Sequence, residues 1–183
     1  MLLSVPLAGD SIQDCVDSFF SSTPVPGWLC ESCGMRHPAS RSGLAVPSDA
    51  VPDWPRFLLV GLKRFTQDSG GAQRKSDRIV TAPLSLRIGV ESQERPGYRG
   101  LENGRPVARW SDNSAAYRLV GVAAHHGLHL ESGHWTALVH CERGWAHCDD
   151  STIEEPLSKR TAARCKAGAT VFLYEVEEAV ALC

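Results

Sequence analysis

The sequence predicts an α+β fold built on a mainly antiparallel sheet. Short apolar or alternating runs between turn residues dominate the second half of the chain. Four such runs follow one another, at residues 117–124, 135–139, 145–148 and 170–176. Two of them flank a turn at residues 141–144, which indicates an antiparallel hairpin. Helical character is confined to residues 10–20 and 159–166, so helices are expected to be few.

Length and composition are typical of one globular domain. The chain has 183 residues, of which 43% are hydrophobic and 22% charged. Its 19 basic and 21 acidic side chains leave a net charge of −2, which favours neither nucleic acid nor an anionic membrane as a partner. No apolar run approaches the roughly 20 residues that span a bilayer.

The cysteine count bears on the cellular compartment. The apolar start of the chain, residues 1–7, is short and carries no basic residue and no small-residue cleavage site, so no signal peptide is expected. Seven cysteines without such a signal fit thiols or metal ligands better than a disulfide framework. We therefore expect the protein in the cytoplasm, the nucleus or both.

The expected helix at residues 10–20 rests on its apolar spacing. One helical face carries Ile12, Cys15, Val16, Phe19 and Phe20. Asp10 followed by Gln13 is typical of a capping box at its start. Residues 21–27 contain two prolines and a glycine, which end the helix.

The middle of the chain alternates strand signals with turn signals. Residues 57–62 form an apolar run that predicts a buried strand, and Lys63-Arg64 is expected at its solvated end. Two glycines within residues 66–75 predict a turn or loop. Shorter strands are expected at residues 79–80 and 84–88. The polar stretch 91–114 is interpreted as a surface insertion.

The hairpin brings possible catalytic groups together. A glycine-rich loop leads through Gly133 to His134, at the start of one strand. Counting outward from the turn places Asp149 and Asp150, at the end of the return strand, within a residue or two of His134. A carboxylate there would bind one ring nitrogen of the histidine and leave the other to take a proton. The alternative is chance, because a chain with seven histidines brings some histidine near an aspartate anyway.

The motifs around this hairpin resemble those of ubiquitin-specific proteases. The His box of that family resembles His126-Gly127, Ser132 to Ala137, and Trp145-x-x-Cys148 to Ile153. Further similar stretches, in the family's order, are Ser11 to Phe19, Trp28 to Gly34, Pro55 to Phe65 and Ala169 to Glu175.

The resemblance implies a fold and a reaction. The fold is that of papain-like cysteine proteases, with a fingers-like portion at residues 1–55 and a palm-like sheet at 56–183. The reaction is hydrolysis of isopeptide bonds to the ubiquitin C-terminus, with ubiquitin and ubiquitinated proteins as partners. His134 would be the general base, Asp149 its orienting residue and Asp150 a neighbour that assists. Gly133 and Trp135 would bind the substrate tail.

The chain also departs from the family pattern. No stretch resembles the Asn, Gly and Cys box that carries the nucleophile, and the helical thumb that holds it is expected to be missing. The chain alone is therefore expected to be inactive. The alternative is a non-catalytic ubiquitin-binding or scaffold module. Another cysteine as nucleophile is disfavoured, because Cys148 would lie on the orienting strand and Cys15 on a helix's apolar face.

Cys30 and Cys33 have the spacing of half a zinc site. By resemblance they correspond to the second cysteine pair of the zinc-bearing fingers, and no first pair is found. Zinc takes four ligands, so a structural zinc ion stays open at this position, and a turn with two thiols is the alternative. No cofactor is expected to be required. The histidines at 125, 126 and 129 are interpreted as ordinary loop residues.

Overall fold

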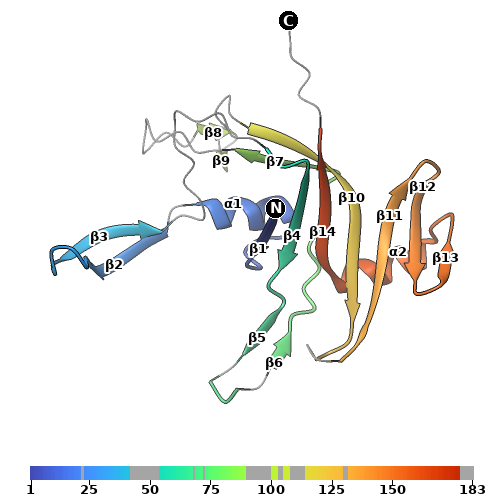
Figure 1. The fold of residues 1–183 in the computed structure, drawn as a ribbon, viewed down its shortest axis with the longest axis horizontal. Helices are drawn as coiled ribbons and strands as arrows, with labels where there is room; N and C mark the ends of the chain where they lie inside the picture. Colours follow the sequence, from blue (N-terminus) through green and yellow to red (C-terminus); the bar gives the residue numbers. More distant parts are fainter. Residues whose placement is uncertain are drawn as a thin grey trace, which may run out of the picture.

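The computed structural model describes residues 1–21, 23–41, 54–67, 69–71, 73–89, 100–102, 105–107, 114–129 and 132–177. Its main feature is an eight-stranded sheet with the order β1-β4-β14-β10-β11-β12-β13, in which β7 also pairs with β10 (Figure 1). These strands are β1 (Leu2–Val5), β4 (Phe57–Leu62), β7 (Ser85–Gly89), β10 (Ser114–His126), β11 (His134–Cys141), β12 (Gly144–Asp149), β13 (Thr152–Glu154) and β14 (Ala169–Val176).

Three small hairpins stand apart from this sheet. They are β2–β3 (Thr23–Leu29 and Arg36–Arg41), β5–β6 (Phe65–Gln67 and Gln73–Lys75) and β8–β9 (Gly100–Glu102 and Arg105–Val107). The β2–β3 hairpin projects to one side of the molecule, and the β5–β6 hairpin continues beyond the end of β4 (Figure 1). The sheet and the short hairpins make the fold mainly β.

The described residues contain two helices, α1 (Ile12–Phe20) and α2 (Lys159–Gly168). Their apolar residues Ile12, Val16 and Cys165 join one core cluster with the inward side chains of the sheet. The alternation along β4 shows this directly, because Leu58 and Val60 are fully buried while their neighbours Phe57 and Leu59 are exposed. Burial of this apolar face is the main force that holds the helices on the sheet. No described helix has the length and apolar character needed to cross a membrane.

Most expected strands are confirmed, and the sheet class needs one correction. The strands expected at 57–62, 84–88, 117–124, 135–139, 145–148 and 170–176 correspond to β4, β7, β10, β11, β12 and β14. The sheet is mixed, because β1 pairs in parallel with β4 in the register Leu2↔Leu59. Strands β1, β3, the short β13 and the proline-containing β2 were not expected from the sequence. The prolines of β2 are tolerated in a hairpin outside the main sheet.

The first helix is confirmed, but its cap lies one residue later than expected. Ser11 is the N-cap, and its Oγ accepts from the Asp14 backbone N–H at 3.1 Å. Asp14 Oδ2 accepts from the Ser11 N–H at 3.0 Å and completes the capping box. Gln13 instead exchanges hydrogen bonds with the backbone of Arg87 on β7. The helix is thereby tied to the edge of the sheet.

Two expectations for the middle of the chain are wrong. Residues 79–80 form no strand, because Arg78 O accepts from Arg64 and Thr81 pairs with the start of α1. Arg64 is fully buried and not solvated at a strand end. Its Nε donates to Ala169 O at 2.6 Å and its Nη1 to the carbonyls of residues 76 and 78 at 3.1 and 2.7 Å. Of the expected insertion 91–114, residues 100–102 and 105–107 form β8–β9, Ser114 begins β10 and the rest lies outside the described residues.

Candidate active site

The sheet positions His134 at the first residue of β11, where it pairs with His126 across β10. Gly133 precedes it with φ +154, and a Cβ at Gly133 would lie 2.3 Å from Nε2 of the His125 ring. The sequence analysis attributed this glycine to substrate approach. The structure shows a second reason, because the buried His125 ring occupies the space that a side chain would need.

His134 and Asp149 form a hydrogen-bonded pair. The distance from His134 Nε2 to Asp149 Oδ1 is 2.5 Å. The hydrogen bond that His134 donates to Asp149 raises the pKa of His134, and the same bond lowers the pKa of Asp149. With Nε2 donating to the carboxylate, Nδ1 is the ring nitrogen left to exchange a proton with a substrate or nucleophile. The predicted meeting of these two residues is confirmed.

Asp150 lies beside this pair. It occupies the turn between β12 and β13 with φ 50, a left-handed conformation that aspartate tolerates better than most residues. Its charge also raises the pKa of His134. A ring nitrogen of His134 and carboxylate oxygens of Asp149 and Asp150 lie within 4.8 Å of one another. The two carboxylates therefore place negative charge beside the imidazole.

An aromatic cluster flanks the site. Trp135 has 49% of its surface exposed, and its ring lies 4.9 Å from that of His125 between centroids. The Phe65 ring also contacts His125, with 5.7 Å between the ring centroids. Burial, followed by the charge of Lys75, lowers the pKa of His125 and so favours its neutral form. The exposed Trp135 is therefore the member of this cluster that a substrate chain could touch.

None of the six described cysteines forms a hydrogen bond with His134. Cys148 pairs with Ala137 inside the sheet, and Cys15 is fully buried in the core. Cys165 lies 3.7 Å from Thr136 Oγ1, and burial raises the pKa of its thiol. A nucleophile should be a stabilised thiolate next to the base. The described residues therefore bring a histidine and a carboxylate together without a thiol placed beside them.

Cys30 and Cys33 lie in the turn of the β2–β3 hairpin. Cys30 O accepts from the Gly34 N–H at 2.8 Å, and Cys30 N–H donates to Met35 O at 2.9 Å. The backbone N–H of Cys33, followed by that of Ser32, lowers the pKa of the Cys30 thiol. This geometry suits a thiolate ligand, but no third His, Cys, Asp or Glu of the described residues joins the two thiols. The described residues thus offer half of the ligands that a zinc site needs.

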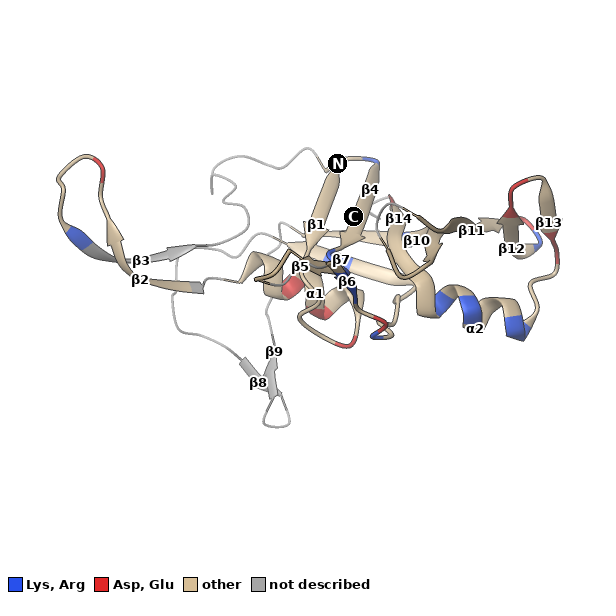
Figure 2. Cartoon of the chain, turned by 90° about the horizontal axis from the view of Figure 1, so that it is seen from below, with Lys and Arg blue, Asp and Glu red and all other residues tan. Residues whose placement is uncertain are grey.

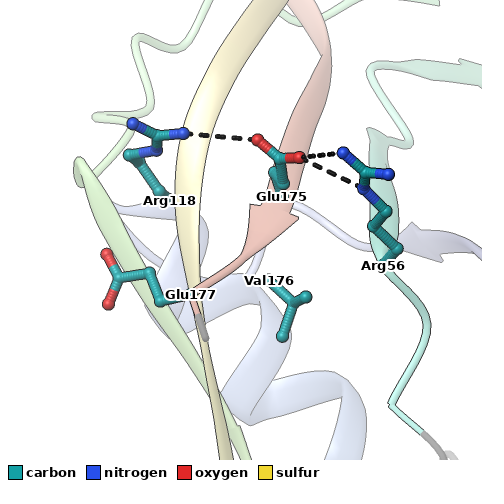
Figure 3. A pocket seen from close by; sticks show the side chains of 5 residues that line it. All are labelled: Arg56, Arg118, Glu175, Val176 and Glu177. Atoms are coloured by element: carbon teal, nitrogen blue, oxygen red, sulfur yellow. Dashed lines mark hydrogen bonds and ion pairs between the residues drawn. The ribbon is translucent and has the colours of Figure 1, made fainter. Parts of the chain in front are cut away.

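The surface of the described residues has two separate hollows beside the sheet. One of about 700 Å³ contains Glu175 between Arg56 and Arg118, at 3.2 and 3.3 Å (Figure 3). It lies away from His134, because Arg118 and His126 are at opposite ends of β10. A smaller hollow of about 280 Å³ is lined by Asp149 and by residues of α2, whose lysines and arginines are visible in Figure 2.

Side chains that the sequence analysis did not single out support the pair. Arg164 of α2 lines the smaller hollow with Asp149. Its positive charge adds to the lowering of the pKa of Asp149 and offsets part of the rise in the pKa of His134. Lys75 donates to backbone carbonyls near His134, from a hairpin far away in the sequence. No local pattern marks either residue, since both act through contacts between distant segments.

A histidine oriented by a carboxylate at the end of a sheet is the base-and-orienter pair that nucleophilic hydrolases of several folds share. Residues 12–174 match the family model described as ubiquitin carboxyl-terminal hydrolase, and the chain belongs to this family. It is 27% identical over 169 residues to Ubiquitin carboxyl-terminal hydrolase 21 of Homo sapiens, covering 92% of this chain and 26% of that protein. It is 28% identical over 163 residues to Ubiquitin carboxyl-terminal hydrolase 25 of Arabidopsis thaliana, covering 84% and 21%. The chain therefore spans about a quarter of the length of these relatives.

Solved structures agree with this assignment at the level of the fold. A yeast SAGA deubiquitinating module matches with a TM-score of 0.68 and 22% identity, over 96% of this chain and 35% of that one. A SAGA module bound to monoubiquitin matches with a TM-score of 0.67 and 21% identity, over the same shares of 96% and 35%. The mixed sheet and the two helices of the described residues thus match part of the fold of these modules.

Proposed function

We propose that this chain supplies the general base and the orienting carboxylate for thiol-dependent hydrolysis of isopeptide bonds at the ubiquitin C-terminus. The observation that carries the proposal is the hydrogen bond from His134 Nε2 to Asp149, in a chain of the ubiquitin carboxyl-terminal hydrolase family. The nucleophilic cysteine would come from outside residues 1–183. In this proposal ubiquitin and ubiquitinated proteins are the partners, in the cytoplasm or the nucleus.

Each residue has a defined role in this reaction. Nδ1 of His134 takes the proton of the incoming thiol, and the thiolate attacks the carbonyl carbon of the isopeptide bond. The imidazolium then returns the proton to the departing lysine amine, and water hydrolyses the thioester that remains. Asp149 holds the ring in the tautomer that leaves Nδ1 free and stabilises its charged form. Asp150 adds negative charge beside the ring.

The surroundings of the pair suit an extended substrate tail. Gly133 carries no side chain beside His134, and half-exposed Trp135 offers an aromatic surface next to it. We assign residues 56–183 to a palm-like sheet, which β1 joins through its pairing with β4. The fingers-like portion lies within residues 1–55, and the projecting β2–β3 hairpin is part of it (Figure 1). We base this division into fingers-like and palm-like parts of a papain-like fold on the membership of the chain in its family.

A second function is favoured by one observation, the lack of a described thiol beside His134. In that case the chain is a ubiquitin-binding or scaffold module without chemistry. One of the similar SAGA modules has monoubiquitin bound to it, which supports ubiquitin binding under either function. The two functions differ only in whether His134 and Asp149 act on a bond.

The experiment joins this chain to the nucleophile-bearing segment of a relative's catalytic domain and measures hydrolysis of a fluorogenic ubiquitin substrate. We expect activity that His134→Ala lowers by about 100-fold or more, the usual contribution of a general base. Asp149→Ala should lower it as well, and Asp150→Asn should have a smaller effect. Activity that survives His134→Ala would rule out its role as base.

A parallel measurement on the chain by itself separates the two functions. The chain is incubated with ubiquitin that carries a thiol-reactive C-terminal group, and adducts are sought by mass spectrometry. We expect none, together with reversible ubiquitin binding by calorimetry. An adduct that disappears on His134→Ala would place the nucleophile within this chain. Binding without activity in any fusion would favour the scaffold function.

A further inference from the structure

Lys75 connects the β5–β6 hairpin to the backbone that leads to His134. Its Nζ donates to His125 O at 2.6 Å and to Gly127 O at 3.1 Å, across 50 and 52 residues of sequence. Figure 1 shows the β5–β6 hairpin beside the end of β10, where these two carbonyls lie. No described carboxylate forms an ion pair with Lys75, so its donors are directed at the two carbonyls.

The ammonium group is itself held in place from the core. Lys75 pairs with Phe65 in the β5–β6 hairpin, and the next residue, Ser76, donates its N–H to Arg64 O at 2.8 Å. The buried Arg64 guanidinium donates to Ser76 O at 3.1 Å and to Ala169 O at the start of β14 at 2.6 Å. Lys75 therefore acts from a rigid support and not from a free loop.

The two carbonyls belong to the segment that sets the position of His134. We call the described residues 125–129 and 132–133 the approach loop. Gly127 and Gly133 are packed against each other, since a Cβ at Gly127 would lie 2.9 Å from Gly133 Cα. A Cβ at Gly133 would lie 2.8 Å from His126 O. A shift of the backbone at residues 125–127 would therefore be passed directly to Gly133 and His134.

We propose that Lys75 is a positioning residue that fixes the approach loop and thereby keeps His134 in reach of Asp149. Hydrogen bonds from a charged donor are stronger than neutral ones, so two of them are a firm anchor for a loop. Burial lowers the pKa of Lys75, and the nearby charge of Asp77 opposes this shift. The consequence for catalysis rests on the proposed function, whereas the positioning itself is a property of the free chain.

A direct electrostatic effect of Lys75 can be separated from positioning. The Lys75 charge lowers the pKa of His125 and of His126, but the groups that shift the pKa of His134 are Asp149, Asp150 and Arg164. Removing the charge should raise the pKa of His125 and His126 in any case. The pKa of His134 should fall only if the loop moves and the bond to Asp149 weakens.

The experiment is an NMR titration of the histidine rings in Lys75→Met, Lys75→Arg and Lys63→Met. Lys63 is exposed and carries the same substitution as a control. In Lys75→Met we expect a lower pKa of His134 and a drop in approach-loop order parameters from about 0.85 to below about 0.6. Lys75→Arg should restore both, because a guanidinium can also donate to two carbonyls. An unchanged His134 in a folded Lys75→Met variant would overturn the proposal.

A measurement on the unaltered chain covers the case in which Lys75→Met does not fold. The ammonium protons of Lys75 should exchange with water about tenfold more slowly than those of Lys63, because hydrogen bonds to part-buried carbonyls protect them. Equal exchange rates would overturn the proposal. Neither readout uses ubiquitin, so failure of the hydrolase function would leave the result intact. In the active fusion, Lys75→Met should lower kcat more than it changes KM.

Discussion

His134 and Asp149 meet across the β11–β12 hairpin although they are not register partners. Ala137 pairs with Cys148, so Asp149, one residue further, lies across from Thr136. The carboxylate therefore reaches diagonally to the ring of His134 at 2.5 Å. Diagonal neighbours on one face of a sheet are close enough for such contacts. The hydrogen bond depends on both strand ends being held in place.

The pair predicts a specific pH dependence of stability. The hydrogen bond with Asp149 raises the pKa of His134, so protonated His134 stabilises the folded chain. This contribution is complete below the pKa of an unfolded histidine, about 6.5, and is lost as pH rises through the raised pKa of His134. The same bond lowers the pKa of Asp149, so ionised Asp149 also stabilises the folded chain. This contribution is present above the pKa of an unfolded aspartate, about 3.9, and is lost as pH falls through the lowered pKa of Asp149. His134→Gln should therefore reduce the free energy of unfolding most between about pH 4 and 6.5.

Urea unfolding at pH 5.5 and pH 8.5 measures this difference. His129→Gln is the control, because His129 is an exposed residue of the same loop. The control should change stability equally at both pH values. A His134→Gln effect that does not shrink at the higher pH would contradict the pairing.

Gly133→Ala should destabilise the chain and disturb the site. A Cβ there would lie 2.3 Å from the His125 ring, which is buried and cannot move aside freely. Gly144→Ala is the matched control, since Gly144 also has positive φ, at +113, but open space around its Cβ position. We expect about 1–2 kcal/mol of backbone strain in the control. Gly133→Ala should cost about 1–3 kcal/mol more from overpacking, measured by urea unfolding. Equal losses would show that the ring yields.

Arg64→Met should be strongly destabilising, because this charged side chain is fully buried. It would leave the carbonyls of Ser76, Arg78 and Ala169 without their charged donor. We expect a loss of at least about 3 kcal/mol in the free energy of unfolding. Arg74→Met, at an exposed position of the neighbouring β5–β6 hairpin, should stay within about 0.5 kcal/mol. A small effect of Arg64→Met would mean that water replaces the guanidinium.

The β2–β3 turn should keep its shape without zinc. Its closing bonds, from Gly34 to Cys30 O and from Cys30 to Met35 O, involve only the backbone. Two thiolates are half of the four ligands that zinc takes. A chelator should therefore leave the melting temperature of this chain unchanged. The double variant Cys30→Ser, Cys33→Ser should also keep its melting temperature when the chelator is added. A clear drop with chelator would reveal further ligands outside the described residues.

Local patterns in the sequence determined the elements and much of the candidate site. The apolar stripe of α1, the run at residues 57–62 and the spacing from His134 to Asp149 each depend on short stretches of chain. Periodicity and turn residues report such stretches directly. The cap of α1 was misplaced by one residue because Ser11 and Asp10 are both good caps and only the backbone geometry distinguishes them.

Only the tertiary structure decided which distant segments meet. The burial of Arg64, the parallel pairing of β1 with β4 and the contact from Lys75 to His125 join residues that are about 50 or more positions apart. The sequence around each residue is compatible with a solvated position as well, since the side chains are charged or the strands are short. Their role follows from the carbonyls and strands that the folded chain brings next to them. The sequence by itself predicted that His134 lies near Asp149 and Asp150. The fold determined that Asp149 is the residue that binds the ring, and it determined what holds this pair in place.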